Sequence, residues 1–284
     1  MIRVINYADN KFKKSQNFAC WFNNLLGLTD EFKMFGPSDI DSNYKQQHLQ
    51  IFKAKRGGGY WLWKPFIVKK NLEQLKEGDW LLYLDSGAFL FRSPKKLIEL
   101  AENINQPVIG FELPLIEYQW TKAEIFLKLD VKENIQKTNQ VMGTMFLVKN
   151  TDLGRDFITD YYNTCSINKL IDDSLSVKQN EGFIEHRHDQ SIFSVLYKKY
   201  GFQRFRDISQ RRIYPKSYLK CGYNDVKSTD IEYLLKDGRK FLQNTNRLSL
   251  KKSIVFLHKT NSPIFSLIKF FFKQIIGYNK KYKI

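Results

Sequence analysis

The chain of 284 residues has a hydrophobic fraction of 43% and a formal net charge of +17, from 46 lysine and arginine against 29 aspartate and glutamate residues. This composition is typical of a globular protein with a large core and argues against long disordered segments. The three cysteines lie far apart, which excludes a Cys-x-x-Cys metal or redox motif and indicates a reducing compartment such as the cytoplasm.

Strands and helices alternate along most of the chain. The predicted elements, in chain order, are a strand at 3–8, a helix at 12–26, a strand at 31–35, helices at 42–54 and 64–76, a strand at 79–84, a helix at 94–104, strands at 108–113 and 140–148, helices at 151–164 and 188–200, and short strands at 203–206 and 253–257. The alternation predicts an α/β fold with a mostly parallel central sheet flanked by helices. Without an internal repeat or a linker, one domain over 1–262 followed by a tail at 263–284 is the simplest organisation.

The first helix shows an apolar stripe. The residues Phe12, Phe18, Trp21, Phe22 and Leu25 are spaced for one face of an amphipathic helix.

The strand at 79–84 is almost entirely apolar and ends in Asp85, Ser86 and Gly87. Ligands in open α/β sheets bind beyond the carboxyl ends of the strands, and a carboxylate there is costly to bury without a partner. A turn that uses the side chain of Asp85 and a positive φ at Gly87 explains the same residues without a ligand. The strand alone supports the two interpretations equally.

A second unusual segment, at 56–65, reads Arg-Gly-Gly-Gly-Tyr-Trp-Leu-Trp-Lys-Pro. Glycines let the backbone approach a ligand closely, and the start of the helix that follows can hold an anion. The segment matches neither a P-loop nor a Gly-x-Gly-x-x-Gly fingerprint. A turn packed by aromatic rings is the alternative. We favour a binding loop, because three glycines beside Tyr60, Trp61 and Trp63 are unusual for packing alone.

His188, Asp189 and Gln190 stand at the start of the helix predicted at 188–200. Asp189 either caps this helix or orients and deprotonates a substrate hydroxyl. His186 and His188 would share a face only in an extended segment, so a metal pair here is not a specific prediction.

The apolar strand at 253–257 ends in His258 and Lys259. An imidazole and an ammonium at a strand end suit a metal ligand and a phosphate contact. Alone, His258 is more simply a structural residue, and its interpretation as a ligand depends on its lying near Asp85.

The tail is apolar and basic. Ser266, Lys269, Lys273 and Gly277 fall on one helical stripe, and no acid follows Asp237 in the sequence. This pattern predicts an amphipathic helix that lies on an anionic membrane, with a helix docked on the core as the alternative. The sequence contains no run of about 18 uncharged apolar residues that would predict a membrane-spanning helix.

Five segments together resemble a known family. They are Gly-Gly-Gly-Tyr-Trp-Leu-Trp-Lys-Pro at 57–65, Tyr-Leu-Asp-Ser-Gly at 83–87, Trp-Thr-Lys at 120–122, His-Asp-Gln-Ser at 188–191 and His-Lys-Thr-Asn at 258–261. This succession resembles bacterial glycosyltransferases with the GT-A fold, a Rossmann-related α/β fold, that act in capsule or lipopolysaccharide biosynthesis. The resemblance covers about residues 1–262. It implies transfer of a sugar from a nucleotide-sugar, in the first instance a UDP-sugar, to a hydroxyl of a glycan or a lipid-linked glycan.

The resemblance also implies roles for individual residues. The donor-binding residues are Tyr7, Arg56, Gly59, Tyr60, Trp63, Lys64, Asp85, Ser86, Gly87 and Lys259. The acceptor-binding residues are Trp120, Lys122, Thr144, His188 and Gln190. Asp189 and Asp85 are the expected catalytic residues.

The same family implies a divalent metal, Mn²⁺ or Mg²⁺, held on the donor diphosphate by an Asp-x-Asp motif. Asp85 matches the first acid, Gly87 stands where the second would be, and His258 is the candidate for a further ligand. The tail at 263–284 would hold such an enzyme at the inner face of the plasma membrane, in the cytoplasm.

Two other functions fit the composition. The charge of +17 together with the aromatic residues suits a nucleic-acid-binding protein, although no recognised binding motif is present and we expect no nucleic-acid partner. A membrane-associated scaffold that kept the fold without the second acid of the motif is the other alternative.

Overall fold

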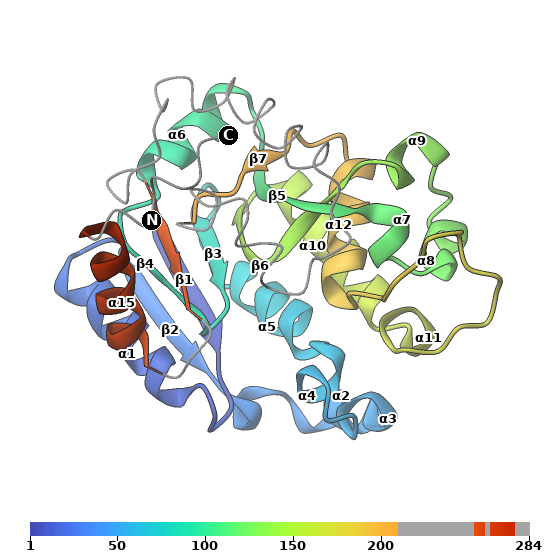
Figure 1. Cartoon of the computed structure of the whole chain (residues 1–284), viewed down its shortest axis with the longest axis horizontal. Helices are drawn as coiled ribbons and strands as arrows, with labels where there is room; N and C mark the ends of the chain where they lie inside the picture. The colour runs from blue at the N-terminus through green and yellow to red at the C-terminus, as the bar shows by residue number, and fades with distance from the viewer. Residues whose placement is uncertain (210–252, 259–261, 276–284) are drawn as a thin grey trace.

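The computed structural model describes residues 1–209, 253–258 and 262–275, and its centre is a six-stranded sheet with the strand order β2-β1-β3-β6-β5-β7 (Figure 1). The strands are β1 (Ile2–Tyr7), β2 (Glu31–Phe35), β3 (Trp80–Leu84), β5 (Val108–Ile116), β6 (Asn139–Lys149) and β7 (Phe205–Arg206). β6 pairs antiparallel with both of its neighbours, and the other pairs in this sheet are parallel. The predicted α/β fold with a mostly parallel sheet is confirmed.

Helices cover both faces of this sheet. The longer ones are α1 (Lys13–Leu25), α5 (Trp63–Leu72), α6 (Lys95–Asn103), α10 (Asp152–Cys165) and α12 (Asp189–Lys199). α5, α10 and α12 pack over one face through a cluster that includes Tyr83 and Phe146. α6 packs on the other face, against residues such as Val4 and Leu82. The period of two along each strand therefore divides the apolar side chains between two core layers.

Several short elements were not predicted from the sequence. They are the 3₁₀ turn η1 (Pro37–Asp39), the helices α4 (Gly57–Tyr60), α7 (Glu117–Trp120), α8 (Ala123–Lys128), α9 (Glu133–Gln136) and α11 (Asn168–Ile171), and the strand β4 (Ala88–Leu90). The helices α2 (Ser42–Gln47) and α3 (Leu49–Phe52) fall within the helix predicted at 42–54. β4 pairs antiparallel with β8 (Val255–Leu257) in a separate two-stranded ribbon. The predicted helix at 42–54 is two short helices, because His48 leaves the helical conformation between them.

The buried face of α1 differs from its apolar stripe. Trp21 and Leu25 are exposed, while Phe18 and Phe22 pack half-buried against Phe89. The side chain of Gln16 is buried instead. Its Nε2 donates to Asn6 Oδ1 at 3.0 Å and to the Phe35 carbonyl at 2.8 Å. α1 thus satisfies polar groups near the ends of β1 and β2, which hydrophobic periodicity cannot reveal.

The helix in the tail, α15 (Pro263–Ile275), lies beside α1 (Figure 1). Leu267 and Phe270 pack it onto the cluster that contains Phe256 and Phe89. A different arc of the helix is exposed, and it consists of Ile264, Phe265, Ile268, Phe271 and Phe272. α15 therefore docks on the protein and still presents an apolar face. None of the described helices is both long and apolar enough to cross a membrane.

Candidate functional site

The carboxyl ends of β1 and β3 meet where the order of the strands reverses. β1 pairs with β2 on one side and with β3 on the other. Ser86 Oγ, just after β3, donates to the Tyr7 carbonyl at 2.5 Å and joins the two strand ends. Such a reversal leaves a crevice outside the strand ends, which is where open α/β sheets bind ligands.

A cavity of about 890 Å³, here called the strand-end cavity, opens at this point. Its lining includes Tyr7, Asp9, Lys11, Lys45, Lys55, Trp61, Trp63, Asp85, Ser86, Gly87, Thr144 and His258. Three of these residues are lysines and two are acids, so the lining has a net positive charge. A cavity of this size and charge suits an anionic ligand larger than a single sugar.

A buried lysine links the cavity to α12. Lys64 Nζ lies 2.7 Å from Asp189 Oδ2 and 3.6 Å from Asp85 Oδ1, and it donates to the Gly143 carbonyl at 3.0 Å. Its side chain is only 3% exposed. Lys64 is in the first turn of α5, and Asp189 is the first residue of α12, so two helix starts supply the pair.

Two tyrosines complete the environment of these carboxylates. Tyr83 donates to Asp85 Oδ1 at 2.5 Å, and Tyr161 donates to Asp189 Oδ2 at 3.2 Å. Burial and the charge of Asp85 raise the pKa of Tyr83 well above its ordinary value, and burial together with Asp189 does the same to the pKa of Tyr161. Both hydroxyls therefore keep the protons that they donate.

The two acids of this network differ in environment. Burial raises the pKa of Asp189, against the opposing effect of Lys64. Burial alone would lower the pKa of Lys64, but the charges of Asp189 and Asp85 outweigh it and the pKa is raised, so Lys64 stays an ammonium. Asp189 is buried and does not line the strand-end cavity, whereas Asp85 lines it and is 31% exposed. The structure thus places Asp189 behind Lys64 and Asp85 facing the cavity.

His258 reaches the same cavity from β8. Its backbone N–H donates to the Gly87 carbonyl at 2.7 Å, and both His258 and Asp85 line the cavity. A methyl group at Gly87 would lie 3.2 Å from the His258 carbonyl, so the close approach of β8 disfavours a second acid there. The antiparallel ribbon of β4 and β8 is what brings the two residues together.

A metal at this position would have few protein ligands. Within residues 1–209, 253–258 and 262–275, no group of three or more His, Cys, Asp and Glu side chains is placed to hold a metal ion. Asp85 Oδ1 is already engaged by Tyr83 and lies near Lys64. One carboxylate and one imidazole suit Mn²⁺ or Mg²⁺ when a bound diphosphate supplies the remaining oxygens.

The glycine segment forms a left-handed turn. Gly57, Gly58, Gly59, Tyr60 and Trp61 all have a positive φ, between +51° and +96°. Left-handed residues other than glycine cost roughly 1–2 kcal/mol each, so the turn needs support. Trp63 Nε1 donates to the Gly57 carbonyl at 2.9 Å, and the His188 ring lies 4.8 Å from that of Tyr60. The turn places consecutive side chains on different sides, and Trp61 lines the strand-end cavity whereas Tyr60 does not.

Replacing Gly59 with alanine tests this turn. At its φ of +96°, a methyl group would lie 3.1 Å from Phe52 Cα and 3.2 Å from the Ile51 carbonyl. We expect Gly59→Ala to lower the free energy of unfolding by about 2–4 kcal/mol in urea denaturation. Gly78→Ala is the matched control, because Gly78 has a φ of +85° with open space around its Cβ, and it should cost about 1 kcal/mol. Equal losses for the two variants would contradict the steric argument.

The predicted donor-binding residues divide into three groups. Tyr7, Trp63, Asp85, Ser86 and Gly87 line the strand-end cavity. Arg56, Gly59, Tyr60 and Lys64 do not line it. Arg56 pairs with Glu185, and Gly59 is buried inside the turn. Lys259 lies outside the described residues.

The ring of Trp63 has a defined role in this wall. It stacks on the ring of Tyr7 with the centroids 3.8 Å apart and the planes 15° from parallel. This pair joins the start of α5 to the end of β1. The two rings therefore form one rigid side of the strand-end cavity.

The predicted acceptor-binding residues are mostly outside this cavity, and only Thr144 lines it. Trp120 is buried under the guanidinium of Arg187, 4.4 Å from its ring. Gln190 donates to Gln140 at 2.9 Å and accepts from the Gly143 N–H at 3.1 Å. The structure therefore does not gather these residues at one surface.

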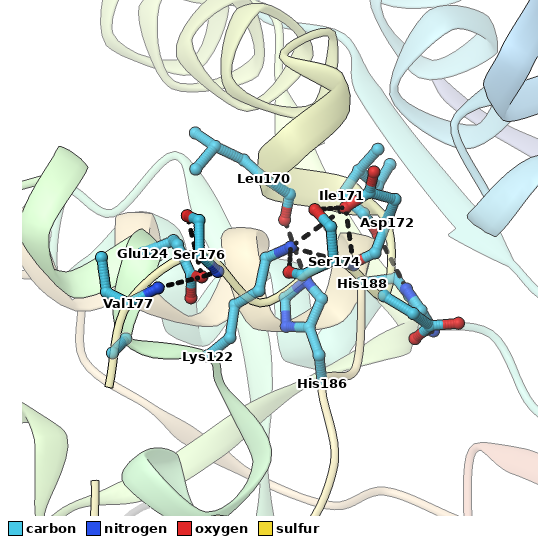
Figure 2. A network of polar contacts seen from close by, with 12 residues as sticks. Lys122, Glu124, Leu170, Ile171, Asp172, Ser174, Ser176, Val177, His186 and His188 are labelled. Atoms are coloured by element: carbon cyan, nitrogen blue, oxygen red, sulfur yellow. Dashed lines mark hydrogen bonds and ion pairs between the residues drawn. The ribbon is translucent and has the colours of Figure 1, made fainter. Parts of the chain in front are cut away.

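Lys122 belongs to a separate network (Figure 2). Its Nζ donates to the Asp172 carbonyl at 2.9 Å and to the Ser174 carbonyl at 3.0 Å, and it pairs with Asp172 Oδ1 at 3.3 Å. Glu124, two residues on, accepts from the N–H groups of Ser176 and Val177. The pair of side chains anchors the loop at 172–179. Lys122, which the family resemblance predicts to bind the acceptor, is instead fully buried beneath this loop.

Some residues of the site gave no signal in the sequence. Lys11, Lys45 and Lys55 line the cavity, but isolated lysines are common on any surface. Tyr83 and Tyr161 resemble ordinary core residues of a strand and a helix. Only their hydroxyls' partners, Asp85 and Asp189, identify them as part of the site.

The fold is similar to solved structures of glycosyltransferases. A galactosyltransferase, LgtC, solved with donor and acceptor sugar analogues, is 14% identical, with a TM-score of 0.48 over 90% of this chain and 86% of that one. Mouse xyloside xylosyltransferase 1 is 10% identical, with a TM-score of 0.46 over 92% of this chain and 98% of that one. The bifunctional glycosyltransferase WbbM is 9% identical, with a TM-score of 0.48, and the matched part is 90% of this chain but 45% of WbbM. Neither a family model nor a curated protein matches the sequence.

Proposed function

We propose that this protein is a glycosyltransferase that moves a sugar from a nucleotide-sugar, in the first instance a UDP-sugar, to a hydroxyl of a glycan or lipid-linked glycan during surface polysaccharide biosynthesis. One observation carries the proposal. Asp85 and His258 lie together in a lysine-lined cavity at the reversal point of the sheet. This combination suits a ligand that joins a diphosphate to a ring system.

The chemistry of sugar transfer explains the charges. When the bond between sugar and diphosphate breaks, negative charge grows on the leaving diphosphate and must be stabilised. Lys11, Lys45 and Lys55 line the cavity and supply positive charge. Asp85 and His258 would hold a divalent metal on the same diphosphate, and a bound metal supplies Lewis-acid stabilisation of the leaving group.

Lys64 and Asp189 act as positioning residues in this proposal. The ammonium of Lys64 holds Asp85, Asp189 and the Gly143 carbonyl within 3.6 Å or less. Lys64 thereby keeps the Asp85 carboxylate oriented toward the cavity. Since Asp189 is buried, it fixes Lys64 and does not reach the acceptor hydroxyl as a base, which corrects the catalytic role predicted for it from the sequence.

The direct test is turnover of nucleotide-sugars. We expect slow hydrolysis of at least one UDP-sugar, measured as release of UDP, and loss of that activity in EDTA. Calorimetry should show that Mn²⁺ binds much more tightly when UDP is present, because Asp85 and His258 alone are too few ligands. No turnover of any donor under any metal condition, together with no binding of UDP, would refute the proposal and leave the non-catalytic scaffold.

We also propose that the protein lies on the anionic inner face of the plasma membrane through α15. The exposed arc of this helix carries five large apolar side chains, and Lys269 lies beside it on the helix. Residues 276–284, which lie outside the described residues, add Lys280, Lys281 and Lys283. Apolar groups with flanking lysines are the combination that binds anionic lipid.

A triple variant tests the membrane role. Phe265, Ile268 and Phe272 are exposed, so changing all three to serine should leave thermal unfolding unchanged. Because each loses about 1–2 kcal/mol of burial in lipid, we expect partitioning onto phosphatidylglycerol vesicles to fall more than about tenfold. Leu127→Ser, at an exposed leucine of α8, is the control and should partition like the unaltered protein. Unchanged partitioning of the triple variant would contradict the proposal.

A further inference from the structure

A second cavity, of about 550 Å³, lies against the left-handed turn. Tyr60 lines it, whereas the next residue, Trp61, lines the strand-end cavity. The turn at 57–61 is thus a wall that the two cavities share. The side of this wall that carries Tyr60 faces the loop that follows α11.

The lining of the second cavity suits a ligand rich in hydroxyls. Besides the Tyr60 ring, it contains carboxylate, amide and hydroxyl side chains, which belong to Gln50, Asn168, Asp172, Asp173 and Ser174. These groups accept and donate the hydrogen bonds that sugar hydroxyls make, and an aromatic ring packs against the apolar face of a sugar. Its two acids and one lysine, Lys53, reverse the charge balance of the strand-end cavity, which disfavours phosphate or carboxylate groups.

His188 shows that one donor is missing beside this cavity. Its Nδ1 lies 2.7 Å from the Ile171 carbonyl, which can only accept, so Nδ1 carries the proton. Burial lowers the pKa of His188 to about 4, so at neutral pH its Nε2 is an acceptor. In the part of the chain that the structure describes, Nε2 has no hydrogen-bond partner, and it faces Asp173 Oδ1 at 3.7 Å. Arg56 Nη1 lies 4.0 Å from the same Asp173 oxygen, so among the described residues His188 Nε2 is the acceptor without a donor. A ligand hydroxyl can donate to one of these two acceptors, and a water molecule can donate to both.

The walls of the cavity are held in place before any ligand binds (Figure 2). Lys122 fixes the backbone at Asp172 and Ser174 from below. His186 and His188 hold the Leu170 and Ile171 carbonyls of α11. Asp173 is therefore presented from an anchored loop, which reduces the entropy lost on binding.

From this arrangement we infer that the second cavity binds a neutral sugar unit of the acceptor glycan, with a sugar hydroxyl donating to Asp173 and the sugar ring packed on Tyr60. The inference rests on the proposed function, because it assigns the acceptor of that same reaction. It places the acceptor on the opposite side of the glycine turn from the donor. None of the five residues predicted to bind the acceptor lines this cavity, although His188 and Lys122 contact residues of its wall.

The test uses lactose, cellobiose and maltose as neutral probes, titrated into the full-length protein by NMR with and without UDP. We expect at least one of them to bind. Asp173→Ala should weaken that disaccharide about tenfold or more, because a hydrogen bond to a charged group is lost. Tyr60→Ala should weaken it as well. The matched control is Glu181→Ala, which removes an exposed acid from the same connection between α11 and α12 and should leave the affinity unchanged.

A parallel titration with UDP separates this inference from the proposed function. Asp173→Ala should bind UDP like the unaltered protein, since Asp173 does not line the strand-end cavity. If none of the three disaccharides binds, or if Asp173→Ala and Glu181→Ala bind the disaccharide equally well, the inference is overturned whatever UDP does. If the disaccharide binds through Asp173 while UDP fails to bind, the cavity assignment stands and the proposed donor is wrong.

Discussion

Replacing Lys64 with methionine is expected to lower the free energy of unfolding by about 3–5 kcal/mol, the largest stability loss that the structure predicts. The change leaves the buried carboxylate of Asp189 without its cation, and only Tyr161 then remains as a partner seen in the structure. An unpaired charge at this depth is far more costly than the pair was favourable. Urea denaturation followed by tryptophan fluorescence measures the loss.

A second variant distinguishes charge from packing. In Lys64→Met combined with Asp189→Leu both partners become apolar, so most of the lost stability should return. Lys69→Met is the control on the same helix, because the pair of Lys69 with Glu73 is partly exposed and worth about 0.5 kcal/mol. If the double variant is no more stable than Lys64→Met alone, the unpaired charge is not the cause.

Asp85→Asn should reduce transfer or donor hydrolysis, measured as kcat/KM, by about 10²–10³-fold. The variant keeps the shape of the side chain and an oxygen for Tyr83, but it loses the charge that would hold a metal on the diphosphate in the proposed reaction. Stability should change little, because Asp85 is 31% exposed and faces the cavity. Calorimetry should show that the joint binding of Mn²⁺ and UDP is lost.

Asp79→Asn is the matched control for this variant. Asp79 immediately precedes β3, and its carboxylate pairs with the amino terminus at 2.7 Å, far from the strand-end cavity. It should keep full activity. Asp85→Asn activity within tenfold of the unaltered protein would exclude Asp85 as the essential acid of the site.

The positions of Asp85, Lys64 and Lys122 differ in how far the sequence could predict them. The position of Asp85 was predictable, because an acid directly after an apolar strand of an α/β sheet lies at the crevice beyond the strand ends. The function of Lys64 was not, because a lysine in the first turn of a helix is usually on the surface. Its burial depends on Asp189, 125 residues later in the sequence, reaching the same point from α12. Lys122 illustrates the same limit, since its partners lie in a loop about 50 residues away.

For α1 and for the turn at 57–61, neighbouring residues predicted the local backbone, whereas distant residues decided which side chains are buried. The stripe on α1 predicted the helix correctly and its buried face only in part, because Gln16 is buried to satisfy groups of β1 and β2. Three glycines at 57–59 indicated a turn with positive φ values. Tyr60 and Trp61 adopt the same conformation, and the rings of His188 and Trp63 pack against the turn and support it.

By itself, the sequence determined the α/β class, the position of Asp85 at the end of a strand, the glycine turn and the apolar helix at the C-terminus. Each follows from periodicity or composition over neighbouring residues, which act through the local backbone. The tertiary structure alone decided that His258 joins Asp85, that Lys64 lies between two acids, and that two cavities flank one turn. These are contacts between distant segments. Only the packing of β8, α5 and α12 against the sheet brings the charged side chains of these segments together. Because an unpaired buried charge is costly, each buried charge lies beside an oppositely charged or hydrogen-bonding partner.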